Sequence, residues 1–342
     1  MALSKIDTTN MIEDVPQSKL DNNINFRNIA INGDMSIAQR GTSTTGLQNS
    51  PEYLIDRWSY RRSGTFTSAT FSMAQSTDVP TGQGFTKSAK IDCTATESSL
   101  PADVFAAFNQ AIEGQMLQYL KKGTSNAESL ALSFWVKSNK TGTYIFNLID
   151  QDNARQISKS YTIDTADTWE KKTIILDADT TGTLDNDNAA SCQLYWYFCA
   201  GSNFTSGTLS TTWSSTTDAN RAVGQVNLAD STSNEWYITG VQLEAGATAS
   251  DFEFLPHDVN ENRCMRYFEK LTGQSIYSSI TSNGNSYVQW YFKLRKRAAP
   301  TVTNSGTGAT GTINRIHVDG AGLYKSNAHS IWGTTATADS EL

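Results

Sequence analysis

The chain is poor in charge and has no excess of positive charge. Of its 342 residues, 18% are Asp, Glu, Lys or Arg, below the roughly 25% of an ordinary globular protein. The 27 Lys and Arg are outnumbered by 34 Asp and Glu, which gives a net charge of −7. A groove that follows nucleic-acid phosphates needs a strong positive field. We therefore expect no nucleic-acid partner.

Long apolar runs and metal-ligand spacings are absent as well. No window approaches the roughly 18–20 apolar residues of a membrane helix, and residues 1–10 lack the apolar core of a secretory signal. We therefore expect a chain that is made in a cytoplasm and does not insert into a membrane. The four cysteines have no metal-ligand spacing, and reduced thiols are expected. Cys192 and Cys199 lie seven residues apart in one strand-like run, which predicts opposite faces.

Catalytic patterns are missing in the same way. His257, His317 and His329 all fall in the last quarter of the chain, so nucleophiles in the larger part have no base nearby in the sequence. No P-loop, nucleophile elbow or HExxH motif is present. Two closely spaced carboxylates suffice for glycoside hydrolysis, but the Asp pairs at 150/152 and 177/179 are more typical of turns. We expect no enzyme and no cofactor.

Hydroxyl and aromatic side chains are abundant. The chain has 37 Ser and 42 Thr, which make 79 of 342 residues or 23%, together with 8 Trp, 13 Tyr and 14 Phe. Its surface should be hydroxylated and weakly charged, and its aromatic residues can fill real cores. At 100–200 residues per domain, roughly, the length predicts two domains.

Most of the chain has the pattern of short β-strands separated by turn residues. In residues 130–137, apolar side chains alternate with a mixed set, as in a half-buried strand. Ten or so strands without long helices predict an all-β fold, an antiparallel β-sandwich of the jelly-roll kind, over residues 27–256. The other expected strands are 53–61, 65–74, 87–93, 104–112, 142–150, 156–163, 168–177, 191–199 and 235–244, with one short helix at 115–121.

Two smaller regions flank the sandwich. Residues 1–26 carry only scattered apolar side chains and are expected to be an arm rather than a domain. After Pro256, Asp258 as N-cap followed by Glu261 predicts an amphipathic helix of about 12 residues. It opens a small, mostly β domain over 257–342. The strands expected in that domain are 273–280, 286–294, 300–303, 310–318 and 321–325, with an Asn283–Gly284 hairpin turn.

The aromatic outliers suggest a sugar-binding surface. Sugars stack their C–H faces on Trp and Tyr, while neighbouring polar groups satisfy the hydroxyls. Trp135 lies on the mixed face of its strand, and Gln193, Tyr195 and Tyr197 share the non-core face of another. One glycan platform formed by these four residues is the hypothesis that this pattern supports. The favoured interpretation is that both faces of these strands are covered, one by the opposite sheet and the other by a loop or by another subunit.

A basic run, Arg295–Lys296–Arg297, stands out in an acidic chain. The favoured interpretation is solvated charge at the end of a strand. Contact with an acidic partner or an anionic glycan is the alternative.

Several short motifs occur in a fixed order over roughly residues 27–300: NGDM at 32–35, AQRGT at 38–42, IDRW at 55–58, IEGQ at 112–115, LSFWVKS at 132–138, YITGVQLEAG at 237–246, FE at 252–253 and CMRYFEK at 264–270. Together these motifs resemble a domain of bacteriophage tail-fibre and related virion proteins. The combination is more specific than any single motif.

This resemblance implies a carbohydrate-binding-module-like jelly roll on a homotrimeric virion fibre, most simply a tail fibre. Such a protein is assembled in the host bacterium, displayed on the virion surface, and contacts host polysaccharide without being an enzyme. Its arm would attach to other virion proteins, of tail or capsid, through apolar residues. In this chain these are Leu3, Ile6, Met11, Ile12, Val15 and Leu20. A structural head fibre or decoration protein, and a polysaccharide-degrading tail spike, are the alternatives. No heptad pattern supports the trimer independently.

The resemblance also bears on calcium. Related jelly rolls often hold a structural calcium with an acidic residue after the opening Asn-Gly and an aspartate in the closing strand. Here Asp34 follows Asn32–Gly33, but Gly240 stands in the place of the closing aspartate. The loop at 184–188 adds Asp185 and Asp187 as further oxygen ligands, although it lacks the spacing of a known calcium loop. Calcium is therefore not expected, and these three aspartates are its only candidates.

Overall fold

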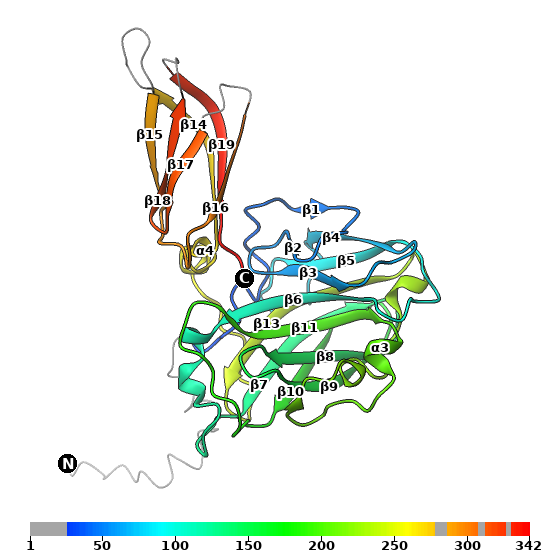
Figure 1. Ribbon diagram of the computed structural model, residues 1–342. Helices are drawn as coiled ribbons and strands as arrows, with labels where there is room; N and C mark the ends of the chain where they lie inside the picture. Colours follow the sequence, from blue (N-terminus) through cyan, green and yellow to red (C-terminus); the bar gives the residue numbers. More distant parts are fainter. Residues whose placement is uncertain (1–25, 278–285, 307–311, 326–329) are drawn as a thin grey trace, which may run out of the picture.

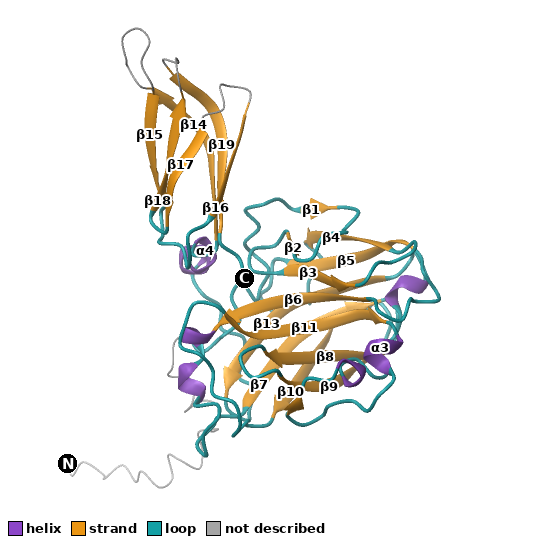
Figure 2. Ribbon diagram, viewed as in Figure 1, coloured by secondary structure: helices purple, strands orange, loops and turns teal. Residues whose placement is uncertain are grey.

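The computed structural model describes residues 26–277, 286–306, 312–325 and 330–342. Figure 1 shows a large sandwich with a smaller, elongated β domain above it, and Figure 2 shows how little helix either part contains. The expected all-β antiparallel sandwich of the jelly-roll type is confirmed. The residues proposed for virion attachment, Leu3 to Leu20, lie outside the described part of the chain.

The sandwich consists of two sheets in which neighbouring strands run antiparallel. The first sheet has the order β1 (Ser43–Thr44), β4 (Thr70–Ser76), β5 (Ser88–Ala95), β13 (Glu235–Ala245), β7 (Leu130–Ser138) and β10 (Glu170–Leu176). The second has the order β12 (Ser214–Ser215), β9 (Arg155–Ile163), β8 (Gly142–Asp150), β11 (Ala190–Ala200), β6 (Phe105–Glu113), β3 (Ser59–Ser63) and β2 (Glu52–Tyr53).

The core lies between these sheets, on the faces that strand alternation predicted. Leu132, Phe134 and Val136 of β7 face it from one side, and Leu194 and Trp196 of β11 face it from the other. Fully burying one such side chain contributes about 1.5–3 kcal/mol. The outer faces of the two sheets therefore point in opposite directions, which decides where surface sites can form.

A bulge in β11 changes the face of one cysteine. The pairing with β6 shifts between Tyr197 and Cys199, so one extra residue is inserted in the strand. Cys192 and Cys199 consequently both face the core, and the expectation of opposite faces is wrong. All four cysteines are buried and free of disulfides, in agreement with the sequence.

The short helices differ from expectation. Residues 115–121 form two 3₁₀ turns, Gly114–Met116 and Gln118–Leu120, rather than an α-helix. The other short helices are α3 (Ser202–Thr205), η4 (Asp218–Asn220) and η5 (Leu228–Asp230). Within the described ranges, no helix has the length and apolar character needed to cross a membrane.

The second domain opens with α4 (His257–Met265), which is shorter than the 12 residues expected and has Pro256 at its N-cap. The predicted helix fails to continue because Phe268 pairs with Asp339 in a sheet. One sheet has the order β14 (Phe268–Tyr277), β19 (Ser330–Asp339) and β16 (Thr301–Gly306). The other has the order β15 (Ser286–Tyr291), β18 (Gly320–Lys325) and β17 (Thr312–His317). The Asn283–Gly284 turn falls outside the described residues.

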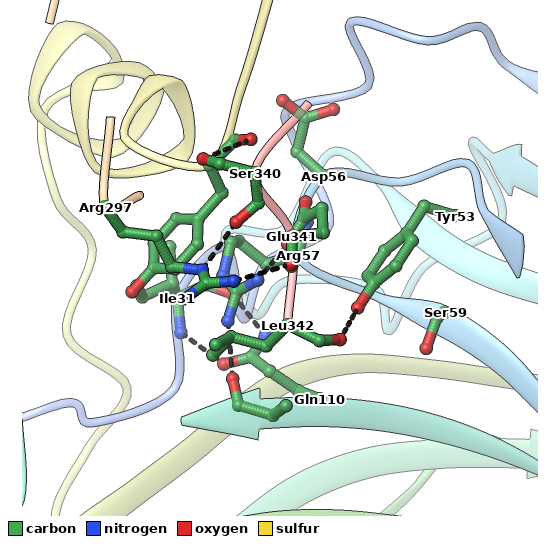
Figure 3. A network of polar contacts seen from close by, with 12 residues as sticks. Ile31, Tyr53, Asp56, Arg57, Ser59, Gln110, Arg297, Ser340, Glu341 and Leu342 are labelled. Carbon is green, nitrogen blue, oxygen red and sulfur yellow. Dashed lines mark hydrogen bonds and ion pairs between the residues drawn. The ribbon is translucent and has the colours of Figure 1, made fainter. Parts of the chain in front are cut away.

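The two domains are joined by a buried arginine. The guanidinium of Arg57, which has 1% of its side chain exposed, forms an ion pair with Glu341 and lies 3.5 Å from the ring centre of Tyr267. It also donates to the carbonyl of Ala111 in β6. Figure 3 shows this network where the end of the chain returns to the sandwich. Arg57 has a left-handed φ of 73°, a conformation that these contacts hold in place.

Further polar contacts surround this centre. Arg266 binds the carboxylate of Glu113 through two hydrogen bonds of 3.0 and 2.8 Å. Tyr53 donates from its hydroxyl to the carbonyl of Leu342 at 2.7 Å. Arg40 stacks on Phe268, with 3.7 Å from the guanidinium to the ring centre. The junction is therefore a packed interface rather than a loose linker.

Two of the three residues in the basic run at 295–297 are bonded within the protein, so the interpretation as solvated charge is wrong for Lys296 and Arg297. Lys296 is buried and donates to Glu269 at 2.7 Å and to the carbonyl of Met265. Arg297 donates to the carbonyls of Glu341 and Asn188, which lie on different domains. Arg295 alone is largely exposed, with 73% of its side chain accessible.

We expect the substitution Glu341→Ala to destabilise the protein by about 3 kcal/mol, because it leaves the Arg57 guanidinium buried without its carboxylate. The matched control is Glu128→Ala. Glu128 pairs with Lys121 on the surface, where the two side chains are 40% and 53% exposed, and its loss should cost about 1 kcal/mol or less. Urea unfolding monitored by tryptophan fluorescence measures both. Equal losses would show that the buried pair does not hold the domains together.

The carboxyl of Asp56, the residue before Arg57, should make the free energy of unfolding depend on pH. Burial raises the pKa of Asp56 to about 6, against the opposing effects of Arg40 and of hydrogen bonds from Gln39. The native state then binds a proton between about pH 4 and 6 that the unfolded chain does not. Stability from Asp56 is therefore present at low pH and is lost as the pH rises through 6.

The substitution Asp56→Asn removes this titration while leaving every other titrating group in place. We expect the free energy of unfolding of the wild type, minus that of the variant, to fall by on the order of 3 kcal/mol between pH 4 and pH 7. Urea unfolding across this range measures it. A difference that does not change with pH would contradict the raised pKa.

Candidate functional site

The four residues predicted to form one glycan platform lie on two different sheets. Trp135 is on the outer face of β7, whereas Gln193, Tyr195 and Tyr197 are on the outer face of β11. Because the two outer faces point away from each other, the single platform is wrong. Alternation along each strand showed that these side chains point away from the core. It could not show to which of the two sheets each strand belongs.

The tyrosines of β11 are mostly covered by the chain itself. Tyr197 is fully buried and Tyr195 is 7% exposed, beneath Phe105, Phe204 and Arg221. Burial raises the pKa of Tyr197 well above that of a free tyrosine. The favoured interpretation of a loop-covered face therefore holds here, because residues 201–234 cross this sheet.

Trp135 lies in a surface hollow of about 260 Å³, which we call the Trp135 hollow. Its lining consists of aromatic rings, one glycine and a few polar groups: Gln83, Phe85, Ser133, Trp135, Lys171, Gly240, Asp251, Phe252 and Phe254. Trp135 is half-buried and Phe254 is 50% exposed, so both rings present surface to solvent. The hollow offers flat apolar faces beside a cation, a carboxylate, a hydroxyl and an amide.

Three phenylalanines pack against one another at one side of this hollow. The ring centres of Phe252 and Phe254 are 4.8 Å apart, and those of Phe85 and Phe254 are 5.1 Å apart. Gly240 of β13 makes room for this packing. Its φ is +62°, and a Cβ there would lie 2.5 Å from the ring of Phe85. Gly240 therefore has a packing role, because a side chain at this position would collide with the ring of Phe85.

The segment that carries Phe252 and Phe254 is fixed to the sandwich by hydrogen bonds between its backbone and the side chain of Gln242. Gln242 of β13 accepts from the amide of Glu253 at 2.7 Å and donates to the carbonyl of Asp251 at 3.1 Å. The segment continues into α4, where Arg263 donates to the carbonyl of Asn28. Phe85, Phe252 and Phe254 together form what we call the aromatic wall. It is preorganised by β13 on one side and by α4 on the other.

Sequence reasoning missed this wall. It placed Trp135 on an outer face but did not single out Phe85, Phe252 or Phe254 as site residues. A signal was present at 252–254, where two phenylalanines alternate with Glu253 after the last strand of the sandwich. Alternation of that kind marks a strand-like segment with one aromatic face.

A second hollow, of about 290 Å³, lies on the other sheet. We call it the Arg221 hollow. Strands β6, β8 and β11 form its floor, and the turn after β8 and the covering segment 201–234 form its sides. The lining residues are Phe105, Ile149, Asp150, Gln151, Ala154, Tyr195, Thr216 and Arg221. Tyr195 thus keeps one solvent-facing edge, while Tyr197 does not line the hollow. Gln193 accepts a hydrogen bond from the hydroxyl of Tyr195.

Two of the aspartates interpreted as turn formers, Asp150 and Asp179, accept hydrogen bonds from turn amides and also belong to a buried ion cluster. Lys122 forms ion pairs with Asp150 and with Asp179, the latter at 2.9 Å. Arg155 binds the same Asp179 through two hydrogen bonds of 2.7 and 2.9 Å. Burial alone would raise the pKa of Asp179, but these hydrogen bonds hold it below its usual value. The cluster secures the turns after β8 and β10.

The three calcium candidates are not brought together. Asp34 accepts a hydrogen bond from Asn260 of α4 at 3.1 Å. Asp185 and Asp187 lie in the loop before β11, where the carboxylate of Asp187 accepts from the amide of Ala189. Within the described ranges, no three His, Cys, Asp or Glu side chains gather in a way that could hold a metal ion.

No protein-family model and no curated protein matches the chain. Among solved structures it is similar to the enzymatically active domain of tailspike protein 4 of bacteriophage CBA120, with 15% identity and a TM-score of 0.33. That match covers 64% of this chain and 21% of the tailspike chain, so the chain spans about a fifth of that protein.

Carbohydrate-binding modules are also among the similar structures. The family 11 module of a cellulosomal cellulase of Clostridium thermocellum has 12% identity and a TM-score of 0.31, over 60% of this chain and 97% of the module. The C-terminal family 22 module of Clostridium thermocellum Xyn10B has 10% identity and a TM-score of 0.29, over 61% of this chain and 96% of the module. The fold assignment rests on the two sheets described above.

Proposed function

We propose that this chain is a non-enzymatic bacteriophage virion fibre, most simply a tail fibre, whose sandwich binds host surface glycan in the Trp135 hollow. The observation that carries the binding role is the exposure of Trp135 and Phe254 beside Lys171, Asp251 and Ser133. Aromatic faces stack on the C–H patches of a sugar ring, and the polar neighbours bind its hydroxyls.

The carboxylates that line the two hollows described above support a binding role rather than hydrolysis. Glycoside hydrolysis requires two carboxyl groups that flank the scissile bond. The lining of the Trp135 hollow has one, Asp251, and that of the Arg221 hollow has one, Asp150. Asp150 is already bound by Lys122. A polysaccharide-degrading spike is accordingly the less favoured alternative.

The proposed virion role is supported by the short motifs that resemble virion fibre proteins and by the apolar residues of the arm. Deleting residues 1–26 should leave the sandwich folded, because its described core begins at Ile29, yet abolish incorporation into particles. Mass spectrometry of purified particles, with the full chain as the reference, measures incorporation. Particles that contain the truncated chain at full copy number would exclude the arm as the attachment segment.

The binding role is tested by Trp135→Ala and Phe254→Ala. Each variant removes one stacking face of the hollow, and we expect at least a tenfold loss of affinity for the glycan that the wild type retains from a panel of bacterial capsular and O-antigen polysaccharides. Tenfold corresponds to about 1.4 kcal/mol, which is of the size expected for one aromatic contact. Biolayer interferometry on the immobilised polysaccharides measures the affinity.

The control is Tyr119→Ala, because Tyr119 is as exposed as Phe254, at 50%, and lies outside the hollow. Its affinity should equal that of the wild type. If all three variants bind equally well, the glycan site is elsewhere. If the wild type retains no polysaccharide, the structural head-fibre or decoration role is favoured instead.

A further inference from the structure

The Arg221 hollow contains a buried cation that is incompletely paired. The side chain of Arg221 is 9% exposed, and among the described residues the only carboxylate bound to it is that of Asp218, at 3.2 Å, whose own side chain is 62% exposed. The Nε–H of Arg221 is buried and has no hydrogen-bond partner. Buried polar groups are nearly always satisfied, so the guanidinium of Arg221 keeps hydrogen-bonding capacity that the described part of its own chain does not use.

The guanidinium is held in place by aromatic rings rather than by counter-charges. Its central carbon lies 5.2 Å from the ring centre of Phe105, 5.3 Å from that of Tyr195 and 5.7 Å from that of Phe204. The backbone of Arg221 is fixed as well, because its carbonyl accepts from the hydroxyl of Ser158 in β9. In Figure 1, α3, which carries Phe204, lies beside β8 and β11. The cation is therefore preorganised at low conformational cost.

The one carboxylate that lines the Arg221 hollow, that of Asp150, is neutralised by a cation of the chain. This carboxylate is paired with Lys122 and accepts from the amide of Asn153 at 3.1 Å. An incoming anion is thus not opposed by a free buried carboxylate. The floor beside Arg221 is apolar, formed by Phe105, Ile149 and one edge of Tyr195.

We propose that the Arg221 hollow binds a carboxylate-bearing sugar residue, such as a uronic acid, of an acidic surface polysaccharide. The planar fork of a guanidinium matches a carboxylate in two parallel hydrogen bonds. The apolar floor accommodates the C–H face of the ring, and a hollow of about 290 Å³ has room for one or two sugar rings. This inference rests on the proposed glycan-binding function and adds a charge preference to it.

The ligand comparison isolates the carboxylate. Isothermal titration calorimetry of the full chain uses tetrasaccharides of galacturonate, glucuronate, mannuronate and N-acetylneuraminate, each paired with its methyl ester. The ester keeps the ring and removes the charge. We expect at least one acid to bind at least tenfold more tightly than its ester. If no acid binds better than its ester, the inference is overturned.

The substitution Arg221→Met keeps much of the apolar stem and removes the fork, so it should abolish the preference for the acid. Arg62→Met is the control, because Arg62 is a half-buried arginine of β3 that lines neither hollow. Should Arg221→Met fail to fold, Thr216→Trp fills the hollow from an exposed position and leaves Arg221 in place. Acid binding that survives a folded Arg221→Met or Thr216→Trp would also overturn the inference.

The outcomes separate this inference from the proposed function. Loss of polysaccharide retention in Trp135→Ala, with no acid preference in the wild type, would leave the proposed function standing and remove the Arg221 site. Absence of any retention by the wild type would remove both.

Discussion

The structure depends most on one buried charge, the guanidinium of Arg57 at the junction of the two domains. It is taken out of water on all sides and is compensated by Glu341 from the end of the chain, by the ring of Tyr267 and by a carbonyl of β6. A buried ion that is bound from two domains ties their folding together, because neither domain alone can satisfy it. The small domain is therefore held in one orientation on the sandwich.

This constraint extends to the Trp135 hollow through the segment that joins the domains. That segment is bound to β13 by Gln242 and ends in α4, which packs on the sandwich beside the junction. Its phenylalanines form the aromatic wall of the hollow. Some of the motifs that resemble virion fibres contribute to the junction, where Asp56, Arg57, Glu113 and Arg266 lie. Other motifs contribute to the Trp135 hollow, because Trp135, Gly240 and Phe252 belong to them and line it.

Sequence reasoning predicted much of the fold and part of the site. Alternation located β7 and β11 closely, because a half-buried strand must repeat its apolar side chains every second residue. It missed β19, whose Thr- and Ala-rich sequence alternates weakly, and the bulge near Cys199, which depends on pairing with β6. It could not place Trp135 and Tyr195 on opposite outer faces, because alternation assigns a face but not a sheet. The burial of Lys296 also escaped it, since the partner Glu269 is 27 residues away and meets it only in the folded domain.

The central claim is that glycan meets this protein at Trp135, and the indole N–H signal of that residue tests it most directly. The chain has 8 tryptophans, and a spectrum of ¹⁵N-indole-labelled protein resolves one signal for each, with Trp135→Phe assigning the relevant one. During titration with the retained glycan, we expect the Trp135 signal to shift and to saturate at the same concentration as binding, while core residues such as Trp196 and Trp236 stay unchanged. A Trp135 signal that does not move while the glycan is bound would contradict the account.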